Sequence, residues 1–168
     1  MRAKATILSD AELAALAPDL ESYRVERKRK LSSQKSKIEE AICAFANDLP
    51  GHGERGILLI GVEDDGTPTG EPITDELLTQ LAAIRSDGNI LPFPQLHVAR
   101  RTLGGKDIAV VVVEPSPNPP VRLRGTVRVR VGPRRDVATR DEERILTERR
   151  RSWDGPFDQT PDTSATAM

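Results

Sequence analysis

Two short, unbroken apolar runs limit the folds open to this chain more than any other feature. Residues 57–62 read Ile-Leu-Leu-Ile-Gly-Val, and residues 110–113 are four consecutive valines. Such runs are typical of strands that are buried on both faces of a sheet. An extended segment at 96–103 precedes the valines, and Gly104-Gly105 separates the two. This arrangement predicts an antiparallel hairpin.

Two further strands have a different pattern. Residues 126–131 alternate valine with Thr or Arg, which predicts one buried face and one exposed face that carries Arg128 and Arg130. Residues 23–29 alternate more weakly around Val25. We expect both segments to be strands.

Apolar residues at helical spacing predict four helices between and around these strands. The expected capping residues are Ser9 for the first helix, Ser32 or Ser33 for the second, Thr74 for the third and Thr139 for the fourth. Helices and strands are interleaved, yet a hairpin is present. We therefore predict an α+β fold, a small domain with a central mixed sheet flanked by helices, rather than a doubly wound parallel sheet.

The length of 168 residues suits one domain with tails. We expect a flexible N-terminus at 1–9, a folded domain at 10–151, and a disordered tail at 152–168, which is rich in Pro, Asp and Thr. No apolar stretch has the length of a secretory signal or a membrane span. A cytoplasmic protein without a membrane partner is the resulting expectation.

Charge is unevenly distributed although the formal net charge is only −1. Residues 24–37 hold seven basic side chains and one acid, Glu26, and residues 122–151 hold eleven arginines and five acids. A basic face of this kind suits a polyanion. A carboxylate inside a basic run has no use in a purely electrostatic binder, whereas a metal-dependent nuclease needs both kinds of charge.

Four spaced motifs resemble the AlbA-2 domain of the Schlafen family. They are Glu21 with Val25-Glu-Arg-Lys28, then Ile42-Cys-Ala-Phe-Ala-Asn47, then 56–62 with Asp64-Asp65-Gly66, and finally Val129-Arg-Val-Gly132 with Arg134, Arg135, Ala138 and Thr139. The resemblance covers roughly residues 15–150 and implies a nucleic-acid-binding domain with a central mixed sheet. Where the family often has Gly-Gly after the asparagine, this chain has Asp48-Leu-Pro-Gly51-His-Gly53.

The resemblance also implies a candidate catalytic centre. Schlafen nucleases use two Glu and one Asp to bind metal and cleave structured RNA such as tRNA. Glu21 and Glu26 match the two Glu by spacing, and Asp64 is preferred over Asp65 as the third carboxylate. Such oxygen ligands suit Mg²⁺ or Mn²⁺.

The candidate nucleic-acid-binding residues are basic. Lys28 and Lys30 are expected to share a strand face with Glu26, and Arg128 and Arg130 form a second stripe. Arg134 and Arg135 are expected just before a helix start, where backbone N–H groups also favour anions.

The sequence leaves three functions open. The first is a nucleic-acid-binding protein with metal-dependent endoribonuclease activity, and the second is a non-catalytic DNA- or RNA-binding regulatory module. The third is a nucleotide-binding accessory protein. Schlafen cores pair two such lobes into a groove, so the resemblance predicts a homodimer.

Overall fold

The computed structural model describes residues 8–20 and 22–159, with side chains described as far as 151. The helices in these ranges are α1 (Asp10–Leu16), α2 (Lys35–Asn47), α3 (Asp75–Ala83) and α4 (Arg140–Gln159). The strands are β1 (Val25–Lys28), β2 (Gly56–Ile60), β3 (Ile90–Leu91), β4 (Leu96–Leu103), β5 (Lys106–Val113), β6 (Arg122–Leu123), β7 (Thr126–Val131) and β8 (Arg134–Val137).

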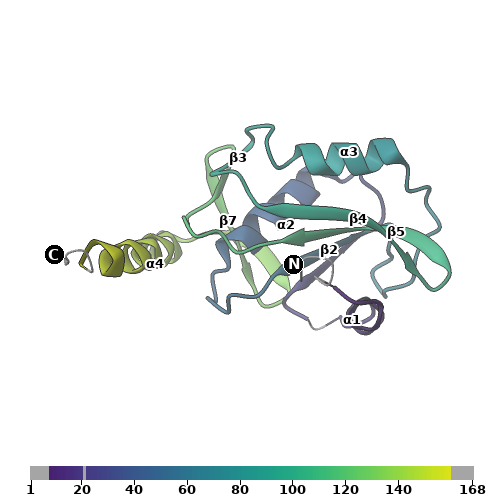
Figure 1. Cartoon of the computed structure of the whole chain (residues 1–168), viewed down its shortest axis with the longest axis horizontal. Coiled ribbons are helices and arrows are strands. Elements are labelled where there is room, and N and C mark those ends of the chain that lie inside the picture. Colours follow the sequence, from purple (N-terminus) through teal and green to yellow (C-terminus); the bar gives the residue numbers. More distant parts are fainter. Residues whose placement is uncertain (1–7, 21, 160–168) are drawn as a thin grey trace.

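The strands form two four-stranded sheets (Figure 1). The first has the order β1-β2-β5-β4, in which β1 runs parallel to β2 and the remaining pairs are antiparallel. The second, of order β3-β6-β7-β8, is antiparallel throughout. The predicted α+β class is confirmed, and the first sheet is mixed as expected. The second sheet was not predicted, apart from its β7 strand.

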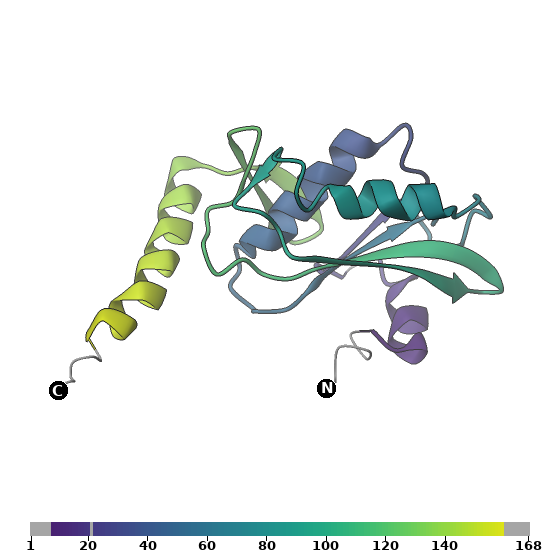
Figure 2. The same cartoon turned by 45° about the horizontal axis from the view of Figure 1, so that its top comes forward.

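Helix α2 lies between the two sheets and contacts both (Figure 2). Nine of its residues are buried, including Ile38, Ile42 and Phe45. The Phe45 ring packs directly over Gly56 of β2, because a Cβ added at Gly56 would overlap that ring. Residues of α2 pack with residues of both sheets in the largest of three apolar clusters, so the helix connects the two sheets.

Helix starts follow local capping chemistry in three of the four cases. Ser9 forms a capping box with Glu12, and Thr74 accepts a hydrogen bond from Leu77 N. Thr139 and Glu142 make a reciprocal pair of the same kind. The prediction for α2 was wrong: Gln34 precedes this helix and makes no side-chain capping bond, so neither Ser32 nor Ser33 is its cap.

Helix α4 projects from one end of the molecule (Figures 1 and 2). Leu146 anchors it against Val127 and Val129 of β7. The helix continues to Gln159, so the expected domain boundary at 151 lies within it. Residues 1–7 and 160–168, which make up most of the predicted flexible N-terminus and part of the predicted tail, lie outside the described residues. Within the described ranges, no helix combines the length and apolarity needed to cross a membrane.

Candidate nucleic-acid interface

Glu26 lies at the centre of a group of buried and half-buried cations. Strand β1 places Glu26 and Lys28 on one face, with Lys28 Nζ 3.0 Å from Glu26 Oε2. Arg130 of β7 forms an ion pair with Oε1, and Arg135 Nε of β8 lies 3.0 Å from Oε2. One carboxylate thus binds three cations that come from both sheets.

A second carboxylate, Glu40 of α2, extends this network. Arg135 Nη1 lies 2.7 Å from Glu40 Oε1, and Arg128 Nη2 lies 3.6 Å from Glu40 Oε2. We call the connected set the Glu26 cluster; it consists of Glu26, Lys28, Glu40, Arg128, Arg130 and Arg135. Four cations against two carboxylates leave this cluster with a net charge of +2.

Arg130 also donates hydrogen bonds to carbonyl groups along the outer edge of β1. Its Nε donates to the Tyr23 carbonyl at 2.9 Å, and its Nη2 donates to the Val25 carbonyl at 2.9 Å. The side chain is only 7% exposed, and its Cζ lies 5.1 Å from the centroid of the Phe45 ring. The expected exposed stripe is therefore wrong for Arg130. Its guanidinium is drawn inward by the Glu26 carboxylate and by carbonyls that the sheet leaves unpaired.

The other basic residues differ in exposure. Lys28 is buried, and Arg128 is half-buried. Lys30 lies beyond the end of β1, so it does not share the strand face with Glu26. Arg134 and Arg135 belong to β8 and not to a helix start, because α4 begins only at Arg140.

Arg134 and Lys30 are exposed. Within the part of the chain that the structure describes, neither side chain has an ion pair or hydrogen bond. Among the candidate nucleic-acid-binding residues, these two are therefore the cations that are most accessible to a ligand.

The cationic partners of Glu26 keep its carboxyl group ionised. Burial is the strongest single influence and raises the pKa of the carboxyl, but the charges of Arg135, Lys28 and Arg130 together outweigh it. The resulting pKa lies below its ordinary value. Glu26 is consequently ionised near neutral pH and keeps the three cations in place.

Two of the three candidate catalytic carboxylates line one cavity. Glu26 and Asp64 border a cavity of about 190 Å³, together with Lys28 and Arg130. Asp65 instead accepts a hydrogen bond from Thr67 N at 2.9 Å, which lowers its pKa and makes it part of a turn. Glu21 lies outside the described residues.

The donor set of the described residues does not fit Mg²⁺ or Mn²⁺. Both oxygens of Glu26 already pair with cations, so a divalent ion there would displace those cations or be repelled by them. Within 8–20 and 22–159, no three His, Cys, Asp or Glu side chains are grouped so that they could hold a metal ion.

Comparison with known proteins identifies the family. The sequence profile described as Schlafen, AlbA_2 matches residues 21–139. The chain belongs to this family. The matched segment contains β1, α2, β7 and β8, so the AlbA_2 domain includes every member of the Glu26 cluster. Membership of the family indicates a nucleic-acid-related function.

Two solved structures are similar to this AlbA_2 domain. The crystal structure of the DIP2311 protein from Corynebacterium diphtheriae matches with a TM-score of 0.52 and 20% identity, over 71% of this chain and 26% of that chain. The chain thus spans about a quarter of that protein, and the match shows the fold alone. The solution structure of the N-terminal domain of a RecG-related protein from Nitrosomonas europaea is 30% identical, with a TM-score of 0.47, over 59% of this chain and 72% of that chain. None of the curated proteins matches.

Sequence reasoning missed Glu40 as a member of the cluster. Glu39 and Glu40 are adjacent acids in α2, which is otherwise mostly apolar toward its C-terminal end. Glu39 is almost fully buried and pairs with Arg124 at 3.0 Å. Two adjacent acids in a mostly apolar helix were the available signal for this role. A buried carboxylate needs a cationic partner, so these acids indicate ion pairs with basic residues elsewhere in the chain.

Proposed function

We propose that this AlbA_2 domain binds the phosphate backbone of nucleic acid at the Glu26 cluster. The observation that supports the proposal is the net charge of +2 of the cluster, which borders an open cavity through Lys28 and Arg130. Phosphate contacts of this kind are independent of sequence and sensitive to salt. RNA and DNA are both candidate ligands, because the contacts are to phosphate.

In this proposal the residues of the cluster have two roles. Glu26 and Glu40 are positioning residues, because their ion pairs fix the directions of Lys28, Arg128, Arg130 and Arg135. Exposed Arg134 lies outside the cluster, next to Arg135 on β8, and is free to contact phosphate first. The carboxylates thus keep the cations ordered before the ligand arrives, which lowers the entropy cost of binding.

Arg134→Ala is expected to weaken binding and to reduce its dependence on salt. Each lost phosphate contact lowers the slope of log K against log salt by about 0.9 for duplex DNA and about 0.7 for a single strand. Fluorescence anisotropy with labelled oligonucleotides, repeated across a salt series, measures both effects. Arg144→Ala is the matched control, because Arg144 is an exposed arginine on α4 that pairs with Asp141. Equal slopes for wild type and both variants contradict the proposed phosphate contact of Arg134.

A metal-dependent endoribonuclease is the second candidate. The observation that favours it is that Glu26 and Asp64 border the same cavity. It requires cleavage of structured RNA such as tRNA that depends on Mn²⁺, stops with a chelator and is lost in Glu26→Gln. The ion pairs of Glu26 count against it, so we place backbone binding first.

A further inference from the structure

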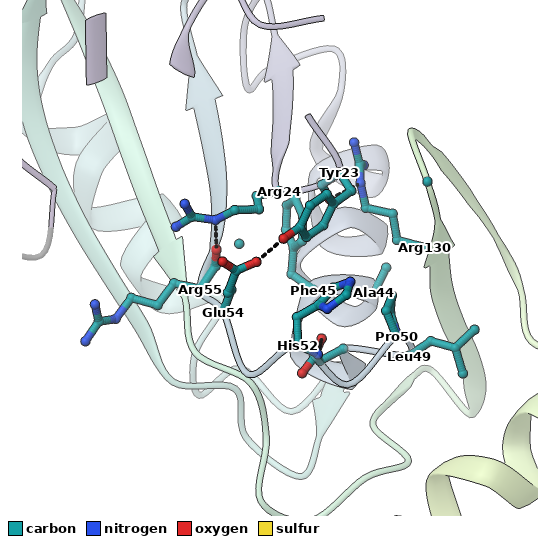
Figure 3. Close-up of a pocket in the computed structure, with 13 residues that line it drawn as sticks. Tyr23, Arg24, Ala44, Phe45, Leu49, Pro50, His52, Glu54, Arg55 and Arg130 are labelled. Carbon is teal, nitrogen blue, oxygen red and sulfur yellow. Dashed lines mark hydrogen bonds between the residues drawn. The ribbon is translucent and has the colours of Figure 1, made fainter. Parts of the chain in front are cut away.

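An aromatic pair stands beside the Glu26 cluster. The rings of Tyr23 and His52 lie with centroids 4.9 Å apart and planes tilted by 50° (Figure 3). Both residues are exposed, and Tyr23 keeps 40% of its surface accessible. They border a cleft whose apolar lining is Ala44, Phe45, Leu49 and Pro50.

The two rings are held from different parts of the chain. Tyr23 Oη donates a hydrogen bond to the Glu54 carboxylate. The Asp48 carboxylate accepts hydrogen bonds from His52 N at 3.3 Å and from Gly53 N at 2.9 Å. This loop contains the positions at which the chain departs from the Gly-Gly of the family pattern.

The size of the cleft decides what can occupy it. Its enclosed volume is about 30 Å³, which leaves room only for ordered water. A planar ligand must accordingly lie on the exposed ring faces instead of entering the cleft. Nucleobases bind exposed aromatic side chains in this way, and stacking is tolerant of sequence because every base has a π-face.

The aromatic pair and the cationic cavity meet at Arg130. Arg130 lines both the cleft and the cavity that contains Glu26. It also donates to the Tyr23 carbonyl at 2.9 Å. A strand whose phosphates lie against the Glu26 cluster would thus carry its bases past Tyr23 and His52.

We propose that one unpaired base of a bound strand stacks on Tyr23 and His52, so that the domain prefers single-stranded nucleic acid over a duplex. The inference rests on the proposed backbone binding and adds that the preferred ligand is single-stranded. In a duplex the base faces are covered by their neighbours, so a duplex can use the Glu26 cluster but not the aromatic pair.

The test compares a single-stranded RNA 12-mer with the blunt duplex of the same sequence, using anisotropy. The double variant Tyr23→Leu/His52→Ala is expected to lose about 10- to 100-fold in single-strand affinity, as for the loss of one stacked base, while duplex affinity is unchanged. Tyr23→Phe keeps the ring but loses the hydrogen bond to Glu54 that holds it, so its single-strand affinity is expected to fall between those of wild type and the double variant. Phe93→Leu, which removes an exposed aromatic residue between β3 and β4, is the matched control.

The outcomes separate the two proposals. Failure of wild type to bind either form, both as RNA and as DNA of the same sequence, overturns backbone binding, and the stacking inference with it. Salt-sensitive binding of wild type that is equal for the two forms, or equal losses for both forms in the double variant, overturns the stacking inference alone. A 2-aminopurine placed in the single strand adds a direct signal, because stacking on the rings is expected to quench its fluorescence and the double variant to restore it.

Discussion

Arg130→Met is expected to lower the free energy of unfolding by about 3–5 kcal/mol, as for other buried ion pairs that lose one partner. The variant leaves Glu26 mostly buried with two cationic partners in place of three. It also removes the donors to the Tyr23 and Val25 carbonyls at the edge of β1. Methionine keeps much of the side-chain volume, so the decrease in the free energy of unfolding measures the loss of the guanidinium and not the creation of a cavity.

Urea denaturation followed by circular dichroism measures this change. Arg144→Met is the control, because that side chain is 63% exposed and pairs only with other exposed groups, so we expect a change below about 0.5 kcal/mol. Arg130→Lys keeps the charge but loses the planar set of donors, and should fall between the two. A loss for Arg130→Met as small as that of the control would show that Arg130 does not join the sheets.

The pH dependence of the stability of Arg130→Met provides an independent check that the ion pair with Glu26 causes the loss. The pKa of Glu26 lies below its ordinary value of 4.5, so its ion pairs contribute stability above that pH and lose it as the pH falls through the folded-state pKa. The deficit of Arg130→Met relative to wild type should therefore be largest near neutral pH and shrink in acid. A deficit that is constant across this range would argue against the ion pair as its cause.

Asn47→Ala is expected to cost about 3 kcal/mol, because it removes the side-chain hydrogen bonds of three backbone groups and leaves the Val121 carbonyl only the contact with Cys43 Sγ at 3.3 Å. Asn47 Nδ2 donates to the carbonyls of Val121 at 2.9 Å and Arg128 at 2.7 Å. Its Oδ1 accepts from Val121 N at 2.6 Å. The side chain is almost fully buried at the end of α2 and connects that helix to the second sheet.

Asn118→Ala is the matched control for this substitution. Asn118 is exposed, and its side chain makes no hydrogen bond within the described residues, so its loss should change stability by less than about 0.5 kcal/mol. Asn47→Asp should be at least as damaging as Asn47→Ala, because it places a carboxylate against two carbonyl oxygens. Thermal unfolding measures all three variants, and a near-neutral Asn47→Ala would contradict the assigned role.

The features that sequence predicted correctly are set by local chemistry. The capping box at Ser9 and the cap at Thr74 depend on residues three positions apart. The hairpin follows from two extended runs around Gly104-Gly105, and it pairs Leu103 with Lys106. Patterns of this range are visible in a single sequence because the interacting residues are neighbours in the chain.

The features that the sequence did not predict depend on residues that are far apart in the chain. Arg130 appears in an alternating strand, yet its ion-pair partner Glu26 lies 104 residues earlier in the chain. Strand β8 contains Arg134, Arg135 and Asp136, a composition that does not favour a strand by itself. No spacing rule encodes which carboxylate neutralises which arginine. The roles of Glu21, the bound Mg²⁺ or Mn²⁺ and the homodimer stay predictions.

The central claim is that Glu26 orders cations for a polyanion, and Glu26→Gln tests it most directly. Glutamine removes one negative charge at almost constant shape, so the net charge of the cluster rises from +2 by one unit. The variant also loses the ion pairs that order Lys28, Arg130 and Arg135, so we expect it to bind single-stranded RNA a few-fold more weakly than wild type, and both proteins to bind equally well in chelator and in Mn²⁺. Binding by Glu26→Gln that is as tight as that of wild type, or tighter, would contradict the claim. Wild-type binding that chelator abolishes would also contradict it and would favour a metal centre at this residue.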